Sequence, residues 1–194
     1  MKKLYGLKKE QMFYIETARQ KVMELFYKFP EKEFSLSDIA KEAGVSKANL
    51  GVILASLKII GFLKIEKLTK IWRVKANQEN WMFKRAKIVY NLNFIYQSGL
   101  VEFLDKSYNN PKSIILFGSF RKGEDTSNSD IDIAIESEAF TEYKTVELKQ
   151  LYDFEKAIGK SIQIHEFNRK HADINVFNNI ANGIILWGFL EVKI

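Results

Sequence analysis

The stretch SIILFGSFRKGEDTSNSDIDIAIE, residues 113–136, decides the fold of the second half of this chain. Its first apolar residues predict a short buried strand that runs directly into Gly118 and Ser119. Ten residues separate Ser119 from Asp130, which opens a second predicted strand that also carries Asp132. Because side chains alternate between the two faces of a strand, both aspartates should point to one side, and the isoleucines beside them into the core.

The aspartate pair indicates the chemistry of this region. Two carboxylates at one spot repel each other unless a cation lies between them. Mg²⁺ suits that position, since it prefers hard oxygen ligands and keeps places for water and phosphate oxygens. Gly118 allows the backbone to approach a phosphate closely, and the Ser119 hydroxyl and nearby N–H groups can donate to phosphate oxygens. The sequence therefore predicts a site for a nucleoside triphosphate with magnesium, against the alternative of an ordinary hairpin with exposed aspartates.

The order Gly-Ser, ten residues, Asp-x-Asp resembles the signature of the polymerase-beta-type nucleotidyltransferase superfamily. Gly123 and Ser129 agree with that signature as well. The resemblance covers about residues 98–194 and is greatest to the minimal members, whose last strand is similar to residues 183–188. It implies two magnesium ions held by the aspartate pair. They would assist transfer of a nucleoside monophosphate, in our expectation AMP from ATP, to an acceptor hydroxyl.

The same resemblance assigns roles to individual residues. The expected nucleotide-binding residues are Gly118, Ser119, Arg121, Lys122 and Ser129. Active members usually carry a third carboxylate on a later strand, which we predict over residues 161–167. Gln163 stands at that position, and its amide can neither act as a base nor supply negative charge. His165 shares the face of Gln163 and joins Asp130 and Asp132 as a catalytic candidate, because histidine can accept a proton near neutral pH.

Two functions therefore remain open. The first is a magnesium-dependent nucleotidyltransferase fused to a DNA-binding module, which the intact Gly-Ser and Asp-x-Asp elements favour. The second, favoured by Gln163, is a non-catalytic transcriptional regulator or antitoxin-like protein. Its degenerate transferase domain would bind only a nucleotide or a partner. Because minimal members often act beside a separate all-helical toxin, the resemblance also implies a toxin-type protein partner.

The first half of the chain has a different pattern. Apolar residues at helical spacing predict an amphipathic helix over residues 8–29. The stretch FSLSDIAKEAGVSKANLGVILASLKIIGFLKIEK, residues 34–67, follows it. In this stretch Ser37 is expected to cap a short helix that Gly44 ends in a left-handed conformation, and Ser46 to cap a second helix.

Two short strands are expected next, over residues 62–65 and 71–74, joined by a turn. The stretch of about residues 8–76 resembles the winged helix-turn-helix family, in which the second helix of the pair enters the major groove. The residues expected to contact double-stranded DNA are Ser46, Lys47, Asn49, Lys64, Lys67 and Lys70. Protein pairing without DNA is the alternative for such a module.

The charge distribution separates the two halves. Residues 1–98 carry 19 Lys and Arg against 9 Asp and Glu, a net charge of +10. Residues 99–194 carry 11 against 15, a net charge of −4. A basic half can attract a polyanion, and an acidic half can hold cations. Lysine-rich surfaces are also common in soluble proteins, so charge alone does not decide between these interpretations.

The expected fold class is α+β, or mixed. A helical winged helix-turn-helix domain would occupy residues 1–78, a connecting helix and linker residues 79–110, and a nucleotidyltransferase fold residues 111–194. This last domain should contain a small mixed sheet flanked by helices. The connecting helix is expected over residues 79–105, with Ser98 and Gly99 as a break or kink. Long apolar helices on either side of the basic module favour a homodimer.

Composition sets the remaining expectations. The chain has 46% hydrophobic residues and no cysteine, which excludes disulfides and thiolate metal sites and favours a folded protein of the cytoplasm. We expect no signal peptide and no membrane span, because no apolar stretch is long enough. The longest apolar run, residues 184–190, is expected to form a buried strand.

Overall fold

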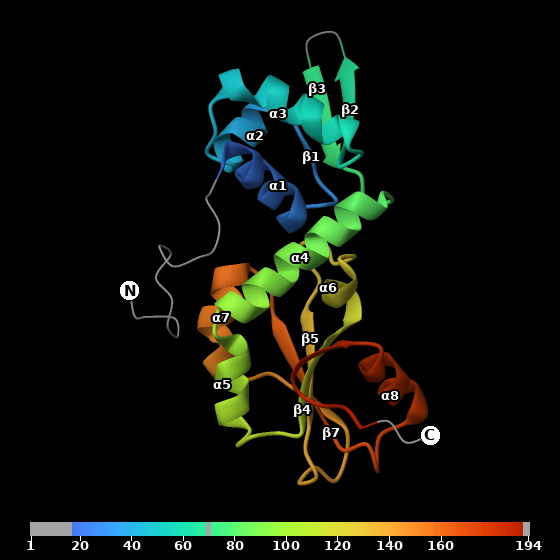
Figure 1. The fold of residues 1–194 in the computed structure, drawn as a ribbon. Helices are drawn as coiled ribbons and strands as arrows, with labels where there is room; N and C mark the ends of the chain where they lie inside the picture. Colours follow the sequence, from blue (N-terminus) through green and yellow to red (C-terminus); the bar gives the residue numbers. More distant parts are fainter. Residues whose placement is uncertain (1–16, 69–70, 192–194) are drawn as a thin grey trace. The chain divides into compact units, whose positions relative to one another are not determined.

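The computed structural model describes residues 17–68 and 71–191. The described chain divides between Tyr90 and Asn91 into two compact units (Figure 1). Among the described residues, no helix is both long and apolar enough to span a membrane.

The first unit combines three helices and the first part of a fourth, which begins at Trp81, with a small antiparallel sheet (Figure 1). Its elements are α1 (Ala18–Lys28), β1 (Glu33–Phe34), α2 (Leu36–Glu42), α3 (Lys47–Ile59), β2 (Leu63–Leu68) and β3 (Ile71–Ala76). The sheet has the order β1-β3-β2, and Ile65 of β2 lies opposite Val74 of β3. An aromatic cluster that includes Phe26, Phe62 and Phe83, each at most 1% exposed, fills the core.

Two helix starts in this unit differ from the sequence-based expectation. The described part of the helix expected over residues 8–29 begins at Ala18, after the N-cap Thr17, and residues 8–16 lie outside the described residues. The cap of α2 is Ser35, and the prediction of Ser37 was wrong. The Ser35 hydroxyl accepts from the Asp38 N–H at 3.2 Å, and the Asp38 carboxylate accepts from the Ser35 N–H at 3.1 Å. This reciprocal capping box satisfies two backbone donors that a cap at Ser37 would leave unpaired.

The later helix boundaries follow the glycines more closely. Gly44 has a φ of +62°, as expected just after α2, and Ser46 is the N-cap residue of α3, although its side chain makes no capping hydrogen bond. The helix expected over residues 79–105 is two helices, α4 (Trp81–Gln97) and α5 (Leu100–Ser107). They are separated at Gly99, whose φ of +77° cannot continue a right-handed helix.

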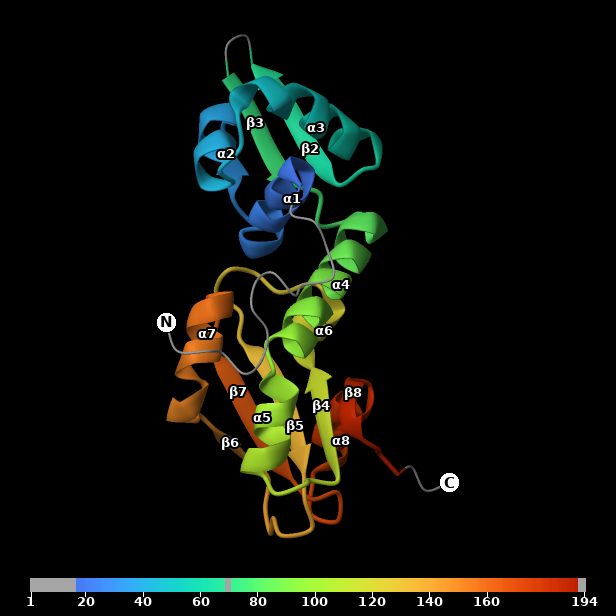
Figure 2. The same ribbon diagram turned by 60° about the vertical axis from the view of Figure 1, so that its left-hand side comes forward.

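The second unit contains a five-stranded mixed sheet with helices on its faces (Figure 2). Its strands are β4 (Ser113–Phe117), β5 (Ile131–Glu136), β6 (Lys144–Val146), β7 (Ile162–Phe167) and β8 (Ile184–Gly188). Its further helices are α6 (Gly118–Lys122), a 3-10 turn (Lys149–Leu151), α7 (Tyr152–Ile158) and α8 (Ile174–Ala181). The strand order is β6-β7-β5-β4-β8; β5 and β7 are parallel, and the other pairs are antiparallel. This arrangement agrees with the expected mixed α+β class.

The two faces of this sheet carry different residues. Ile131, Ile133 and Ile135 of β5 are fully buried in the cluster formed with α5 and α7. The opposite face packs Ala134 of β5 against a smaller cluster that includes Ile180 of α8. Because neighbouring residues of a strand point to opposite faces, the carboxylate of residue 132 belongs to the face that α8 partly covers.

The apolar run at residues 184–190 is not the buried strand that its composition predicted. In β8, Leu186 is 8% exposed, whereas Ile185 is 43% and Trp187 is 51% exposed. The reason lies in the sheet order, since β8 is an edge strand that pairs with β4 alone. An apolar composition therefore did not specify burial here.

Candidate active site

The first feature of the site is the contact between the Gly118 bend and Asp132. In the antiparallel pairing of β4 with β5, Phe117 lies opposite Asp132, and the chain turns into α6 at Gly118 with a φ of +72°. A Cβ atom added to Gly118 would lie 2.1 Å from Oδ2 of Asp132. The carboxylate therefore lies directly against the bend, in space that only glycine leaves open. Ser119 follows as the second residue of α6.

The neighbouring strand β7 supplies a hydrogen-bond donor to each aspartate. The parallel register places Gln163 beside Asp132, and His165 two residues further along the same face. The Gln163 amide Nε2 donates to Oδ2 of Asp130 at 2.8 Å. Nε2 of His165 lies 3.2 Å from Oδ1 of Asp132. Both predicted metal-binding carboxylates thus meet a side chain of β7 at one of their two oxygens.

The hydrogen-bond partners of His165 determine which of its ring nitrogens carries the proton. The Tyr143 hydroxyl lies 2.6 Å from Nδ1, and the Thr145 hydroxyl lies 3.3 Å from the same atom. If the tyrosine hydroxyl donates to Nδ1, the ring proton is on Nε2 and is donated to Asp132. Because both ring nitrogens face protein groups, the arrangement favours orientation of the carboxylate by His165. Its predicted role in proton transfer stays a prediction.

A cavity of about 290 Å³ opens beside the Gly118 bend. Its lining residues are Phe117, Gly118, Arg121, Lys122, Asn179 and Asn182. Two of them, Arg121 and Lys122, are the cations that the sequence suggested as phosphate neighbours. The two asparagines, from α8 and its C-terminal end, were missed. Their signal was present in the sequence, because asparagines at positions 175, 178, 179 and 182 recur at helical spacing on one side of a helix.

Tyr143 was also missed, and no sequence signal could have found it. It lies in the segment between β5 and β6, where neither hydrophobic periodicity nor a motif marks it. Only the pairing of β6 with β7, in which Thr145 lies opposite His165, brings this segment to the ring.

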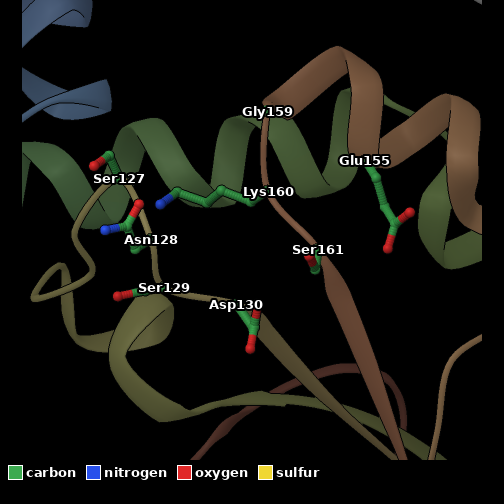
Figure 3. Close-up of a pocket in the computed structure, with 8 residues that line it drawn as sticks. All are labelled: Ser127, Asn128, Ser129, Asp130, Glu155, Gly159, Lys160 and Ser161. Atoms are coloured by element: carbon green, nitrogen blue, oxygen red, sulfur yellow. The ribbon is translucent and has the colours of Figure 1, made fainter.

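A second cavity, of about 260 Å³, lies beside the loop that leads into β5 (Figure 3). Ser129 and Asp130 line it, together with residues of the turn before β7. Ser129 accepts a hydrogen bond from the Thr126 N–H at 2.9 Å, so its hydroxyl holds the loop in place. The buried ion pair between Lys160 and Asp125, with a separation of 3.2 Å, anchors the same loop to the start of β7. The predicted phosphate contact of Ser129 stays a prediction.

The residues present can be compared with the needs of magnesium. No cluster of three or more His, Cys, Asp or Glu suited to a metal occurs within residues 17–68 and 71–191. Among the described residues, no hydrogen bond engages Oδ1 of Asp130 or Oδ2 of Asp132. Mg²⁺ is commonly held by one or two carboxylates together with substrate phosphates and water. The pair therefore fits a magnesium ion that arrives with a nucleotide.

The whole arrangement joins a glycine bend, a carboxylate pair and a basic cavity on one face of a mixed sheet. Residues 98–185 match the family model of the nucleotidyltransferase domain. The match supports a domain of the nucleotidyltransferase superfamily, a general function in nucleotidyl transfer and a nucleotide substrate. Comparison with curated proteins and with solved structures gave no significant match.

Outside the matched residues 98–185, the residues predicted to contact DNA have mixed surroundings. Ser46, Lys47 and Asn49 are exposed at the start of α3. Lys64 forms an ion pair with Glu79. Two further lysines complete the set: Lys67 lies over the Trp72 ring at 4.0 Å, and Lys70 lies outside the described residues.

Proposed function

We propose that the nucleotidyltransferase domain transfers a nucleoside monophosphate, AMP from ATP, to an acceptor hydroxyl with the help of magnesium. The observation that carries this proposal is the position of the Asp132 carboxylate against the Gly118 bend. A triphosphate held at that bend lies within reach of the carboxylate pair, so a cation can contact both the protein and the phosphates.

In this proposal each part of the site has a separate task. The Gly118 backbone and the Ser119 hydroxyl hold phosphate oxygens, while Arg121 and Lys122 attract the triphosphate into the cavity that they line. Asp130 and Asp132 would hold the magnesium, whose positive charge would offset the charge of the phosphates. The acceptor oxygen forms a bond to the α-phosphorus, the bond to the pyrophosphate oxygen breaks, and the hydroxyl proton leaves to solvent.

The test is a transfer assay on the full-length protein. ATP labelled at the α-phosphate and the adenine, with Mg²⁺, is incubated with proteins from co-expression and with RNA. We expect label to move to an acceptor in step with pyrophosphate release. If nucleotide binding is measurable but no acceptor is labelled, the enzyme proposal fails and the non-catalytic one stands.

That second candidate function rests on a specific observation. Gln163 donates an N–H group to Asp130, at the position where the family resemblance leads us to expect a third carboxylate. A domain without that carboxylate could bind nucleotide and act as a regulator or antitoxin-like partner without turnover. A toxin-type partner and a homodimer stay predictions from the sequence. Sedimentation analysis of the purified chain tests whether it forms a homodimer.

We also propose that the first unit binds duplex DNA as a winged helix-turn-helix module. The order of α1, α2, α3 and the β2–β3 hairpin supports this proposal, as does the excess of Lys and Arg. On the outer side of α3, Val52 is 79% and Ile59 is 86% exposed, and these apolar side chains cannot hydrogen-bond to base edges. The affinity should therefore come mainly from phosphate contacts made by lysines.

The expected consequence is a steep dependence on salt. With about four phosphate contacts, DNA affinity should fall about 100-fold between 50 and 200 mM salt, because each contact releases counterions. Fluorescence anisotropy with a labelled duplex measures this fall. Lys67→Gln should reduce the slope of log affinity against log salt concentration by about 1, the equivalent of one phosphate contact. Lys28→Gln, at the exposed end of α1, should leave this slope unchanged. Absence of binding at low salt would refute the proposal.

A further inference from the structure

The surroundings of Asp130 carry a more specific inference, which rests on the proposed function of the nucleotidyltransferase domain. We infer that this site takes up one divalent cation with each nucleotide, not two, and that Gln163 is the residue that limits it to one. The resemblance implies two ions, so the inference separates this chain from that expectation.

The first argument is the position of Gln163. Its strand β7 lies next to β5, and the register places it beside Asp132 on the same face of the sheet. A carboxylate at this position would add a third negative charge next to the pair. Glutamine places a neutral amide there instead.

The second argument is the direction of the amide. Its Nε2 atom donates to Oδ2 of Asp130 at 2.8 Å, so N–H hydrogens point at the space between Gln163 and that carboxylate. A cation placed there would meet hydrogens that carry partial positive charge, and it would have to displace the hydrogen bond to reach Oδ2. The amide thus occupies the position that a second ion needs.

The third argument comes from Asp132. Its Oδ1 atom lies 3.2 Å from Nε2 of His165. The other ring nitrogen of His165, Nδ1, lies 2.6 Å from the Tyr143 hydroxyl, which fixes the orientation of the ring. The carboxylate oxygens without a described hydrogen bond are therefore one from each aspartate, Oδ1 of Asp130 and Oδ2 of Asp132. Two oxygens and two negative charges suit one Mg²⁺ that completes its six ligands with phosphate and water. Two ions about 4 Å apart would bring four positive charges to the same pair.

The experiment counts ions by their paramagnetism. Mn²⁺ stands in for Mg²⁺, and a non-hydrolysable ATP analogue with a methylene group between the α- and β-phosphorus atoms is the nucleotide. Electron paramagnetic resonance of free Mn²⁺ during titration gives the number of ions bound per protein–nucleotide complex. For the wild-type chain we expect one.

Gln163→Glu has nearly the same shape but replaces the amide donor with a carboxylate. In this variant the count should rise to two. Its melting temperature should also rise more with Mn²⁺ than that of the wild type, because the ion relieves repulsion among three carboxylates. Gln150→Glu adds the same charge at an exposed position of the 3-10 turn and should keep the count at one.

The outcomes separate the inference from the function on which it rests. Two ions in the wild-type complex would overturn the inference and leave the proposed function in place. One ion in both the wild type and folded Gln163→Glu would show that Gln163 is not the limiting residue. No Mn²⁺-dependent nucleotide binding by the wild type would remove the proposed function itself. Because the wild-type count decides the first point alone, poor folding of the variant does not prevent the test.

Discussion

Replacing Asp132 with asparagine is expected to lower the rate of nucleotidyl transfer about 1,000-fold. The substitution removes one of the two charges that hold magnesium and changes the oxygen that lies against Gly118 into part of an uncharged amide. Its shape is preserved, and the amide oxygen can still accept the hydrogen bond from His165. The loss should therefore reflect charge at the site and not a disturbed fold.

Initial rates of label transfer measure this effect, with Asp153→Asn as the matched control. Asp153 is exposed on α7 and outside the two cavities, so its variant should transfer at the wild-type rate. The free energy of unfolding of Asp132→Asn should not fall, because the substitution relieves repulsion between two carboxylates in the metal-free protein. Unchanged transfer by this variant would contradict the role that we assign to the pair.

The second large effect is expected from Gly118→Ala. The added Cβ would lie 2.1 Å from Oδ2 of Asp132, so the carboxylate must move away from the bend. The φ of +72° adds a backbone cost of about 1–2 kcal/mol for any residue with a side chain. We expect nucleotide affinity to fall at least about 100-fold, since loss of well-placed charged contacts costs several kcal/mol.

Two other glycines separate the causes of that loss. Gly159 also lies in the second unit and has a φ of +75°, but no atom lies within 4 Å of an added Cβ. Gly159→Ala should therefore lower the free energy of unfolding of this unit by the backbone cost alone. Gly44→Ala carries similar strain in the first unit and should leave nucleotide affinity unchanged. Calorimetric titration with the ATP analogue measures affinity, and equilibrium denaturation measures stability. Equal affinities for Gly118→Ala and the wild type would mean that the bend does not hold the nucleotide.

Much of the fold followed from local patterns. Glycine positions located several helix ends, and the strands on both sides of the Gly118 bend were predicted within one residue of their observed starts. The misplaced cap of α2 was a local error of interpretation, because the Ser35 and Asp38 pair was visible as a capping-box pattern. The exposure of β8 was not a local property, since it depends on which strand occupies the edge of the sheet.

In the candidate site, too, some features follow from local sequence and others from the tertiary structure. The sequence by itself determined that Asp130 and Asp132 lie on one face, because alternation along a strand is a property of the backbone. The pairing of β4 with β5 then placed Asp132 against the Gly118 bend. Only the tertiary structure decided that β7 lies beside β5 and that Gln163 and His165 each reach one aspartate. It alone brought Tyr143 to the histidine. Strand order and register depend on how the whole sheet packs with its helices, and no short stretch of sequence contains that information.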